Sequence, residues 1–223
     1  MTRLDLPAFI TLEGGEGAGK STQVARLVAR LEAVGVPAIA SREPGGTARA
    51  EEIRNLLLSG AAAPLGTAAE ALLFAAARAD HLDSKIRPAL ARGTSVVCDR
   101  FSDSTRAYQG ALGHVPPALL LALEQVVVGE TRPGLTFMLD LPTAVGLSRA
   151  KARHTGAPDR FEREDTAFHE RLRAAFLQIA EGDPARCVVI DAAPDQDTVA
   201  RDIWAATVER LGLPAGEVRQ NGS

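Results

Sequence analysis

Short apolar runs alternate along the chain with longer segments in which apolar residues recur every three or four positions. The runs are rich in β-branched residues, which is typical of buried strands; we place strands at 8–12, 37–41, 94–98, 134–140 and 186–191. The helical spacing predicts helices at 20–34, 46–58, 67–91, 116–128, 142–153, 164–181 and 195–211. This alternation predicts an α/β fold in which a five-stranded parallel sheet is flanked by helices and joined by right-handed crossovers.

No repeat and no linker divides the chain, so we expect a single domain over residues 1–213. The last segment, 214–223, lacks apolar periodicity and is expected to be a disordered tail. Ligands of open parallel sheets bind at the carboxyl ends of the strands. Candidate chemistry should therefore follow directly after each predicted strand.

Composition and net charge exclude several classes of protein function. Of the 223 residues, 46% are hydrophobic, enough for a substantial core, and the net charge of -3 gives no basic surface for a nucleic acid polymer. The most apolar stretch, 116–128, is too short to span a membrane, and Asp5 stands where a secretion signal needs an apolar core. We expect a cytoplasmic protein without membrane contact. Cys98 and Cys187 lie in separate apolar runs, which favours small core residues over a metal or disulfide site.

Residues 14–21 read GGEGAGKS and match the phosphate-binding pattern GxxxxGK(S/T) between a predicted strand and a predicted helix. In such a loop the backbone N–H groups and the helix N-terminus bind phosphate oxygens, Lys20 reaches the β- and γ-phosphates, and the Ser21 hydroxyl can ligate Mg²⁺. A chance glycine-rich turn would lack this context. The predicted nucleotide-binding residues are Gly14, Gly15, Glu16, Gly17, Ala18, Gly19, Lys20, Ser21 and Thr22.

Polar residues also follow the second and third predicted strands. Arg42 begins the segment REPGGT, and Asp99 and Arg100 begin DRF, ahead of further polar residues at 104–109. A single cluster of this kind could be a solvated strand end. Three clusters at successive strand ends instead predict one crevice, where two guanidinium groups would suit bidentate contact with phosphate oxygens.

The segments FITLEGGEGAGKST, REPGGT, LLFAAAR, DRFSDSTRAYQG and VVIDA occur in this order between residue 8 and about residue 210. This combination resembles the thymidylate kinase family, whereas the phosphate loop alone would indicate only the superfamily. The resemblance implies a P-loop, nucleoside-monophosphate-kinase-like fold of three layers. It also implies transfer of the γ-phosphoryl of ATP to dTMP, with Mg²⁺, giving dTDP and ADP.

In the family, the residues that match Phe74 and Arg78 stack on the thymine ring and hydrogen-bond a base carbonyl. These two positions are four apart in a predicted helix and so share one face, although a core Phe beside a surface Arg would give the same pattern. The residues that match Arg42 and Arg100 hold the dTMP phosphate. The resemblance also places Arg100 to neutralise charge during the transfer.

The same resemblance assigns further positions to the sugar and base of dTMP. Tyr108 matches the residue that crowds the sugar 2′ position, and Thr105 and Gln109 match its polar neighbours around the base. Glu16 matches a carboxylate that faces the 3′-hydroxyl. A purely packing role for Tyr108 is the alternative.

Two residues are candidate Mg²⁺ contacts. Ser21 ends the loop motif, and Asp99 ends an apolar strand like a Walker B acid that holds the ion through water. An ion pair between Asp99 and a neighbouring arginine is a comparable alternative, so Asp99 ranks below Ser21. The predicted catalytic residues are Glu16, Lys20 and Arg100, together with arginines of the segment 148–164.

The segment 148–164 is rich in Arg and Lys and is interrupted by Gly and Pro. Most such charge runs are solvated loops, but phosphoryl transfer needs water excluded, which a closing lid provides. Gly17 stands where some family members carry a basic residue, so the chain resembles the bacterial type with a basic lid. Arg149 is assigned to ATP, and Arg153 and Arg160 to catalysis; the sequence leaves open which of the three acts on the phosphates.

The last predicted strand leads into a segment that resembles the loop contacting the adenine of ATP. Backbone groups make most such contacts, so Ala192 and Pro194 mark the loop rather than specific side chains. The predicted helix 116–128 is nearly all apolar and is therefore either deeply buried or part of a subunit contact. The family forms dimers through packed helices, so we expect a homodimer.

Other classes share the phosphate loop. Regulatory GTPases need a guanine-reading NKxD and usually a DxxG switch, and neither motif occurs in the sequence. Another nucleoside-monophosphate kinase is the stronger alternative, because the loop, lid and arginines are common to that group. A structural P-loop ATPase comes third, since it would not use a second anion pocket.

Overall fold

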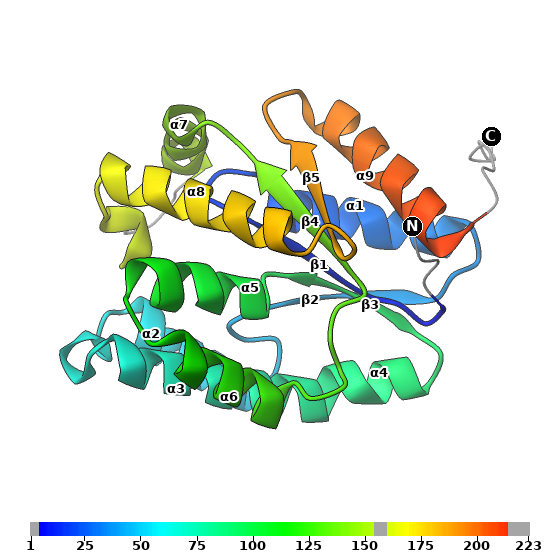
Figure 1. Ribbon diagram of the computed structural model, residues 1–223. Helices are drawn as coiled ribbons and strands as arrows, with labels where there is room; N and C mark the ends of the chain where they lie inside the picture. The colour runs from blue at the N-terminus through cyan, green and yellow to red at the C-terminus, as the bar shows by residue number, and fades with distance from the viewer. Residues whose placement is uncertain (1–4, 154–159, 214–223) are drawn as a thin grey trace.

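The computed structural model describes residues 5–153 and 160–213, and the side chain of Arg153 is also outside the description. Five parallel strands form one sheet in the order β2-β3-β1-β4-β5 (Figure 1). The strands are β1 (Phe9–Gly14), β2 (Ala38–Arg42), β3 (Ser95–Asp99), β4 (Leu135–Asp140) and β5 (Cys187–Asp191). All five predicted strands are confirmed, with ends that shift by one or two residues. The predicted tail, 214–223, lies outside the described residues.

The helices lie in two layers around the sheet. They are α1 (Lys20–Ala33), α2 (Ala48–Leu58), α3 (Thr67–His81), α4 (Arg87–Ala91), α5 (Ser102–Thr105), α6 (Pro117–Val127), α7 (Thr143–Arg153), α8 (Thr166–Gly182) and α9 (Gln196–Leu211). Helices α1 and α9 cover one face, while α4, α5 and α8 cover the other, with α2 and α6 outside next to α3 (Figure 1). The predicted three-layer α/β fold is therefore confirmed.

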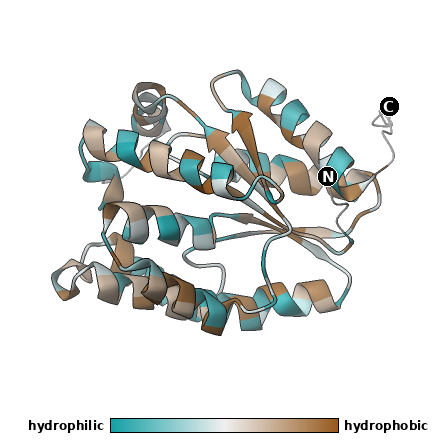
Figure 2. Cartoon of the chain, in the orientation of Figure 1, coloured by the Kyte–Doolittle hydropathy of each residue, from teal (hydrophilic) through white to brown (hydrophobic). Residues whose placement is uncertain are grey.

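Side chains of the central strand alternate between the two faces, as the pleat of a strand requires. Ile10 and Leu12 are fully buried in the cluster beneath α1 and α9, whereas Phe9 packs against Phe101 on the opposite face. In Figure 2 most of strands β4 and β5 is coloured as hydrophobic. Cys98 and Cys187 are free and buried, as predicted, and burial raises the pKa of both thiols.

Two helical segments differ from the prediction. Residues 67–91 do form one helical rod, but the π-helical turn η2 (Leu82–Ile86) separates α3 from α4. Residues 102–112 also form a helix, in which α5 continues into the π-helical turn η3 (Arg106–Leu112). The sequence analysis missed this helix because its polar residues and Gly110 give no apolar period. Two short 3-10 turns, η1 (Ala63–Leu65) and η4 (Phe161–Arg163), complete the described elements.

The register aligns the carboxyl ends of β1, β2 and β3 at one edge of the sheet. Asp99 on β3 pairs with Leu12 on β1 and with Arg42 on β2. The chemistry predicted after each strand therefore converges at this edge. Among the described helices, none is long and apolar enough to cross a membrane.

Candidate active site

The phosphate loop connects the end of β1 directly to the start of α1. Gly14, Gly17 and Gly19 adopt positive φ values of 136°, 73° and 87°, which other residues rarely adopt. At Gly17 a side chain would also collide with the carbonyl oxygen of Gly146 on α7. The glycines therefore let the loop turn sharply and rest against α7, with the N-terminus of α1 facing the loop.

Lys20 folds back over this loop. Its Nζ donates hydrogen bonds to the carbonyl oxygens of Gly14 (3.1 Å) and Gly15 (2.7 Å), and the residue is 8% exposed. Burial, together with the charge of Arg100, lowers the pKa of Lys20 to about 8. The ammonium group is thus held close to where phosphates bind in such a loop.

A cavity of about 270 Å³ opens between the phosphate loop and the ends of β2 and β3. Every residue predicted to bind the second nucleotide lines it: Glu16, Arg42, Phe74, Arg78, Arg100, Thr105, Tyr108 and Gln109. Gly17, Gly19, Lys20, Ser21 and Asp99 line it as well. Residues that the sequence analysis did not single out also contribute, among them Glu43, Arg54, Leu58, Phe161 and Glu162.

Arg100 bridges the two sides of this cavity. It is a non-glycine residue with a positive φ of 67°, at the turn that follows β3. Its guanidinium donates to the Gly14 carbonyl oxygen (3.1 Å), to Ser104 Oγ (3.1 Å) and to Glu16 Oε1 (2.6 Å). The Tyr108 hydroxyl donates to the same Glu16 oxygen at 3.0 Å. Burial alone would raise the pKa of Glu16, but the charges of Arg100 and Lys20 lower it to about 2.

Arg42 is held more loosely at the end of β2. Its side chain is 55% exposed, and Nη2 donates to both carboxylate oxygens of Glu51 at 3.0 Å. Glu51 also accepts the Gly46 N–H at 2.9 Å and so closes the turn of the REPGGT segment. Arg42 therefore lines the cavity with more than half of its side chain exposed.

The far end of the cavity is fixed by a buried ion pair. Arg78, 6% exposed, donates through Nε to Glu43 Oε2 (2.7 Å) and through Nη2 to Thr105 Oγ1 (3.1 Å). The other Glu43 oxygen lies 3.0 Å from His81 Nδ1, and His81 Nε2 lies 2.6 Å from Ser41 Oγ. Arg78 lines the cavity, and its printed hydrogen bonds within the described chain use Nε and Nη2. The sequence analysis quoted Glu43 within REPGGT without giving it a role, and it missed His81, which lies in no quoted motif.

The predicted metal contacts lie side by side. Ser21 Oγ donates a hydrogen bond to Asp99 Oδ2, and both residues line the cavity. Two hard oxygen donors fit Mg²⁺, which is normally bound by one or two protein groups together with phosphates and waters. Among the described residues there is no cluster of three or more His, Cys, Asp or Glu that could hold a metal alone. The donor set therefore fits Mg²⁺ brought with a nucleotide.

The arginines of the predicted lid lie in different places. Arg149 on α7 donates to the carbonyl oxygens of Ala192 (2.8 Å) and Ala193 (2.7 Å), in the loop after β5. Arg160 forms an ion pair with the buried Glu70 of α3, and its guanidinium lies over the Phe161 ring. Neither arginine lines the cavity in this structure. The side chain predicted at position 153 lies outside the described residues.

A phosphate loop and a guanidinium cluster that face one cavity, on a five-stranded parallel sheet, define a P-loop kinase of the nucleoside-monophosphate type. The family model for thymidylate kinase matches residues 12–203. The thymidylate kinase of Nitrobacter hamburgensis is 57% identical over 204 residues, covering 91% of this chain and 89% of the relative. That of Caulobacter vibrioides is 57% identical over 205 residues, covering 92% and 98%. The chain belongs to the thymidylate kinase family.

A solved structure agrees with this assignment. The crystal structure of thymidylate kinase from Ehrlichia chaffeensis matches with a TM-score of 0.72 and 33% sequence identity. The match covers 90% of this chain and 98% of that one. Members of the family are kinases that use ATP as the phosphoryl donor.

Proposed function

We propose that the chain transfers the γ-phosphoryl of ATP to dTMP, giving dTDP and ADP for the synthesis of dTTP. The observation that carries this proposal is the single cavity between Lys20 and the arginines at positions 42, 78 and 100. An ATP on the phosphate loop and a dTMP in the cavity would place donor and acceptor phosphates on either side of Arg100. The transfer needs no general base, because the acceptor phosphate oxygen is already ionised.

The site would place positively charged groups against the negative charges of the two nucleotides and of the moving phosphoryl group. Loop amides and Lys20 would bind the β- and γ-phosphates, and Arg42 would exchange Glu51 for the phosphate of dTMP. Arg100, which is already oriented by three acceptors, would neutralise charge on the moving phosphoryl group. Mg²⁺, when bound with ATP, supplies further charge neutralisation, and Ser21 and Asp99 would hold it.

Recognition of thymine would depend on Arg78 and Phe74. Glu43 and Thr105 fix the guanidinium plane, so the Nη1 donors face an acceptor such as a base carbonyl. The exocyclic amino group of cytosine, a donor, would meet donors there. We assign the Tyr108 ring and Glu16, which line the cavity, to the sugar of dTMP, with contacts to the 2′ carbon and the 3′-hydroxyl.

The segment 148–164 is proposed as the lid of a single kinase domain, residues 1–213. Arg149 would support the adenine loop through Ala192. Arg160, and Arg153 by sequence position, are the candidates to approach the phosphates when ATP binds, which would require Arg160 to leave Glu70. A cytoplasmic location follows as a further proposal.

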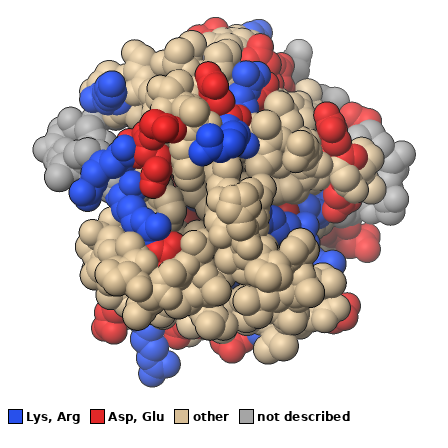
Figure 3. All heavy atoms as spheres, turned by 60° about the vertical axis from the view of Figure 1, so that its left-hand side comes forward, with Lys and Arg blue, Asp and Glu red and all other residues tan. Residues whose placement is uncertain are grey.

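We also propose a homodimer. None of the residues of α6 is buried, which excludes the alternative of a deeply buried helix in one chain. Val126 is 84% exposed, Leu121 50% and Leu72, on the neighbouring α3, 51%. Figure 3 shows a broad uncharged surface over the lower half of the molecule, at the level of these helices. A second copy of the chain would cover this apolar face.

Sedimentation or light scattering tests the dimer. The wild type should have twice the mass of one chain, and Val126→Glu with Leu121→Glu should shift the mass towards one chain, because the charges would be desolvated in the contact. Glu52→Gln, on exposed α2, is a matched surface control. A wild-type mass equal to one chain would contradict the proposal.

A coupled assay with ATP and Mg²⁺ tests the function. We would offer dTMP, dUMP, UMP, CMP, AMP and GMP in parallel and measure kcat/KM for each. dTMP should be the best acceptor by a wide margin. If AMP or CMP is preferred, the assignment of the base is wrong and the chain is another nucleoside-monophosphate kinase; turnover with none of them would contradict the function altogether.

A further inference from the structure

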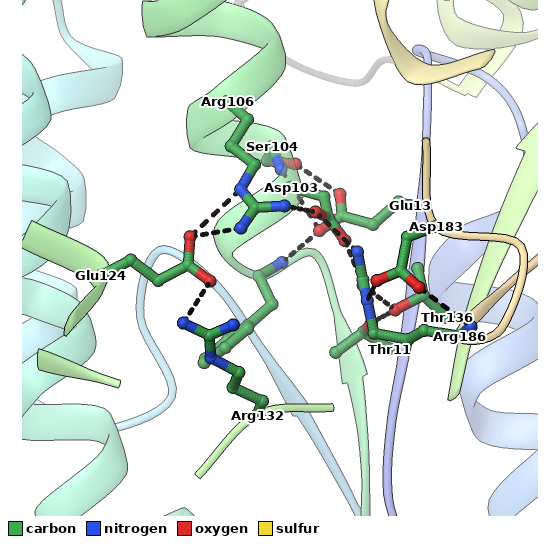
Figure 4. Close-up of polar contacts among 11 residues, drawn as sticks. Thr11, Glu13, Asp103, Ser104, Arg106, Glu124, Arg132, Thr136, Asp183 and Arg186 are labelled. Atoms are coloured by element: carbon green, nitrogen blue, oxygen red, sulfur yellow. Dashed lines mark hydrogen bonds and ion pairs between the residues drawn. The ribbon is translucent and has the colours of Figure 1, made fainter. Parts of the chain in front are cut away.

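A fully buried carboxylate lies directly beneath Arg100 without lining the cavity. Glu13, on β1, is 0% exposed and is absent from the residues that surround the cavity. Its Oε1 accepts the N–H groups of Phe101 (2.7 Å) and Ser104 (3.3 Å), and its Oε2 accepts the Ser104 hydroxyl (2.6 Å). The Phe101 N–H and both Ser104 donors belong to the segment that directly follows Arg100, and Figure 4 shows Ser104 in contact with Glu13.

This turn needs such support. The left-handed conformation of Arg100 is unfavourable for a residue with a Cβ, and such conformations persist only when the surroundings determine them. The helix that starts at Ser102 has no side-chain cap from its own N-cap residue, Phe101. Its first N–H groups would therefore lack partners. Glu13 supplies the capping oxygen from a different strand, where a negative charge is favourable.

The Ser104 hydroxyl connects Glu13 to the Arg100 side chain. Because this hydroxyl donates its single proton to Glu13, its oxygen is left to accept from Arg100 Nη1, which lies 3.1 Å away. Arg100 Nη1 also donates to Gly14, the residue that follows Glu13. The guanidinium is thus fixed to β1 both directly and through Ser104.

Asp103, in the first turn of the same helix, is held by a separate set of contacts. Asp103 pairs with Arg186 (2.6 Å) and Arg106 (3.3 Å), and Arg186 also donates to Thr136 at 2.7 Å (Figure 4). None of these contacts involves Arg100. Burial, with the charge of Asp103, raises the pKa of Glu13 to about 7. Burial of the Glu13 carboxylate is thus costly, and its hydrogen bonds to Phe101 and Ser104 offset part of this cost.

We propose that Glu13 is a positioning residue for phosphoryl transfer. Through the Phe101 N–H and the Ser104 hydroxyl it holds Arg100 in the conformation that directs its guanidinium to the phosphate loop. This inference rests on the proposed function, because it assigns to Arg100 the charge that appears during the transfer. Glu13 itself touches neither nucleotide.

Steady-state kinetics with Ser104→Ala and Glu13→Gln test the proposal. We expect kcat to fall about tenfold in Ser104→Ala, the usual effect of losing one hydrogen bond to a charged group, and further in Glu13→Gln. KM for ATP should stay within about twofold, since the phosphate loop is unchanged. Ser104→Thr keeps the hydroxyl and should restore kcat. Asp103→Asn, which weakens the opposite side of the turn, should lower Tm while kcat stays within about twofold.

A double-mutant cycle separates positioning from plain stability. In an Arg100→Lys background, Ser104→Ala should change kcat less than twofold, because the guanidinium that Ser104 orients is gone. An equal loss in both backgrounds, or a loss in Asp103→Asn as large as in Ser104→Ala, would overturn the proposal. So would a Glu13→Gln enzyme with wild-type kcat.

The role of Glu13 can be tested even if dTMP is not the preferred acceptor. If dTMP is not the preferred acceptor, the same ratios are measured with whichever monophosphate is turned over fastest. An NMR readout needs no substrate: the Arg100 guanidinium N–H signals, assigned by their loss in Arg100→Lys, should be protected from exchange in the wild type and exposed in Ser104→Ala and Glu13→Gln. Unchanged protection would contradict the proposal.

Discussion

Arg100 and Arg42 follow or end neighbouring strands and line the same cavity, yet their surroundings differ. Arg100 is 15% exposed and donates to three separate acceptors, two of them on the phosphate loop. The Arg42 side chain is 55% exposed, and among the described residues its guanidinium pairs with the partly exposed Glu51. Arg100 is held by several buried contacts before any nucleotide binds, whereas Arg42 is held by a single, largely solvated ion pair.

The sequence resemblance assigns both arginines to the phosphate of dTMP, whereas their different surroundings indicate two different roles. A guanidinium oriented in advance stabilises a transition state well, because no reorganisation is needed during the reaction. A mobile guanidinium contributes equally to the bound substrate and the transition state, which affects KM more than kcat. We therefore assign Arg100 to the transfer step and Arg42 to the capture of dTMP.

The largest expected effect is that of Arg100→Ala. We expect kcat to fall on the order of 10³-fold, as when a preorganised donor to a transition state is removed. Circular dichroism should show a folded protein, since the residue lies at a turn outside the hydrophobic clusters. Near-normal turnover would show that Arg100 holds structure only.

Arg42→Ala should have a smaller effect of a different kind. KM for dTMP should rise about tenfold, from the loss of a charge-assisted contact, with kcat within about threefold. Initial rates over a range of dTMP concentrations measure both. A fall in kcat equal to that of Arg100→Ala would remove the distinction between the two arginines.

The stabilising effect of the Glu16–Arg100 ion pair should depend on pH. The pKa of Glu16 falls from an ordinary 4.5 to about 2, so its contribution to stability is complete above pH 4.5 and is lost as the pH falls from 4.5 towards 2. Wild type should therefore exceed Glu16→Gln in Tm at pH 6, with the gap narrowing below pH 4.5. A gap independent of pH would mean that the Glu16 charge does not stabilise the fold.

The smallest effect belongs to Glu51→Gln. Burial alone would raise the pKa of Glu51, but the Gly46 N–H and Arg42 lower it, and the pair is largely exposed. Such pairs contribute roughly 0–1 kcal/mol, so Tm should change little and KM for dTMP should stay within about twofold. An increase in KM as large as in Arg42→Ala would show that Glu51 orients Arg42.

Much of the fold was predictable because strands and phosphate loops are local features. The β-branched runs gave all five strands, and the glycine pattern gave the turn before Lys20. The helix at 102–112 escaped prediction because its polar residues face the cavity and the buried ion pairs instead of forming an apolar stripe. The lid arginines stay predictions: Arg160 pairs with Glu70, and no pattern in the chain announces that contact.

The sequence by itself determined the class of the protein, because a loop that binds phosphate through backbone amides requires only glycines and Lys20 in a fixed local order. Only the tertiary structure decided which side chains hold Arg100 in place and which residues surround each arginine. Glu13 and Ser104 are 91 positions apart in the sequence and form a hydrogen bond because β1 and β3 are paired. Burial and the partners found there then decide which guanidinium is held rigidly and which is free to move.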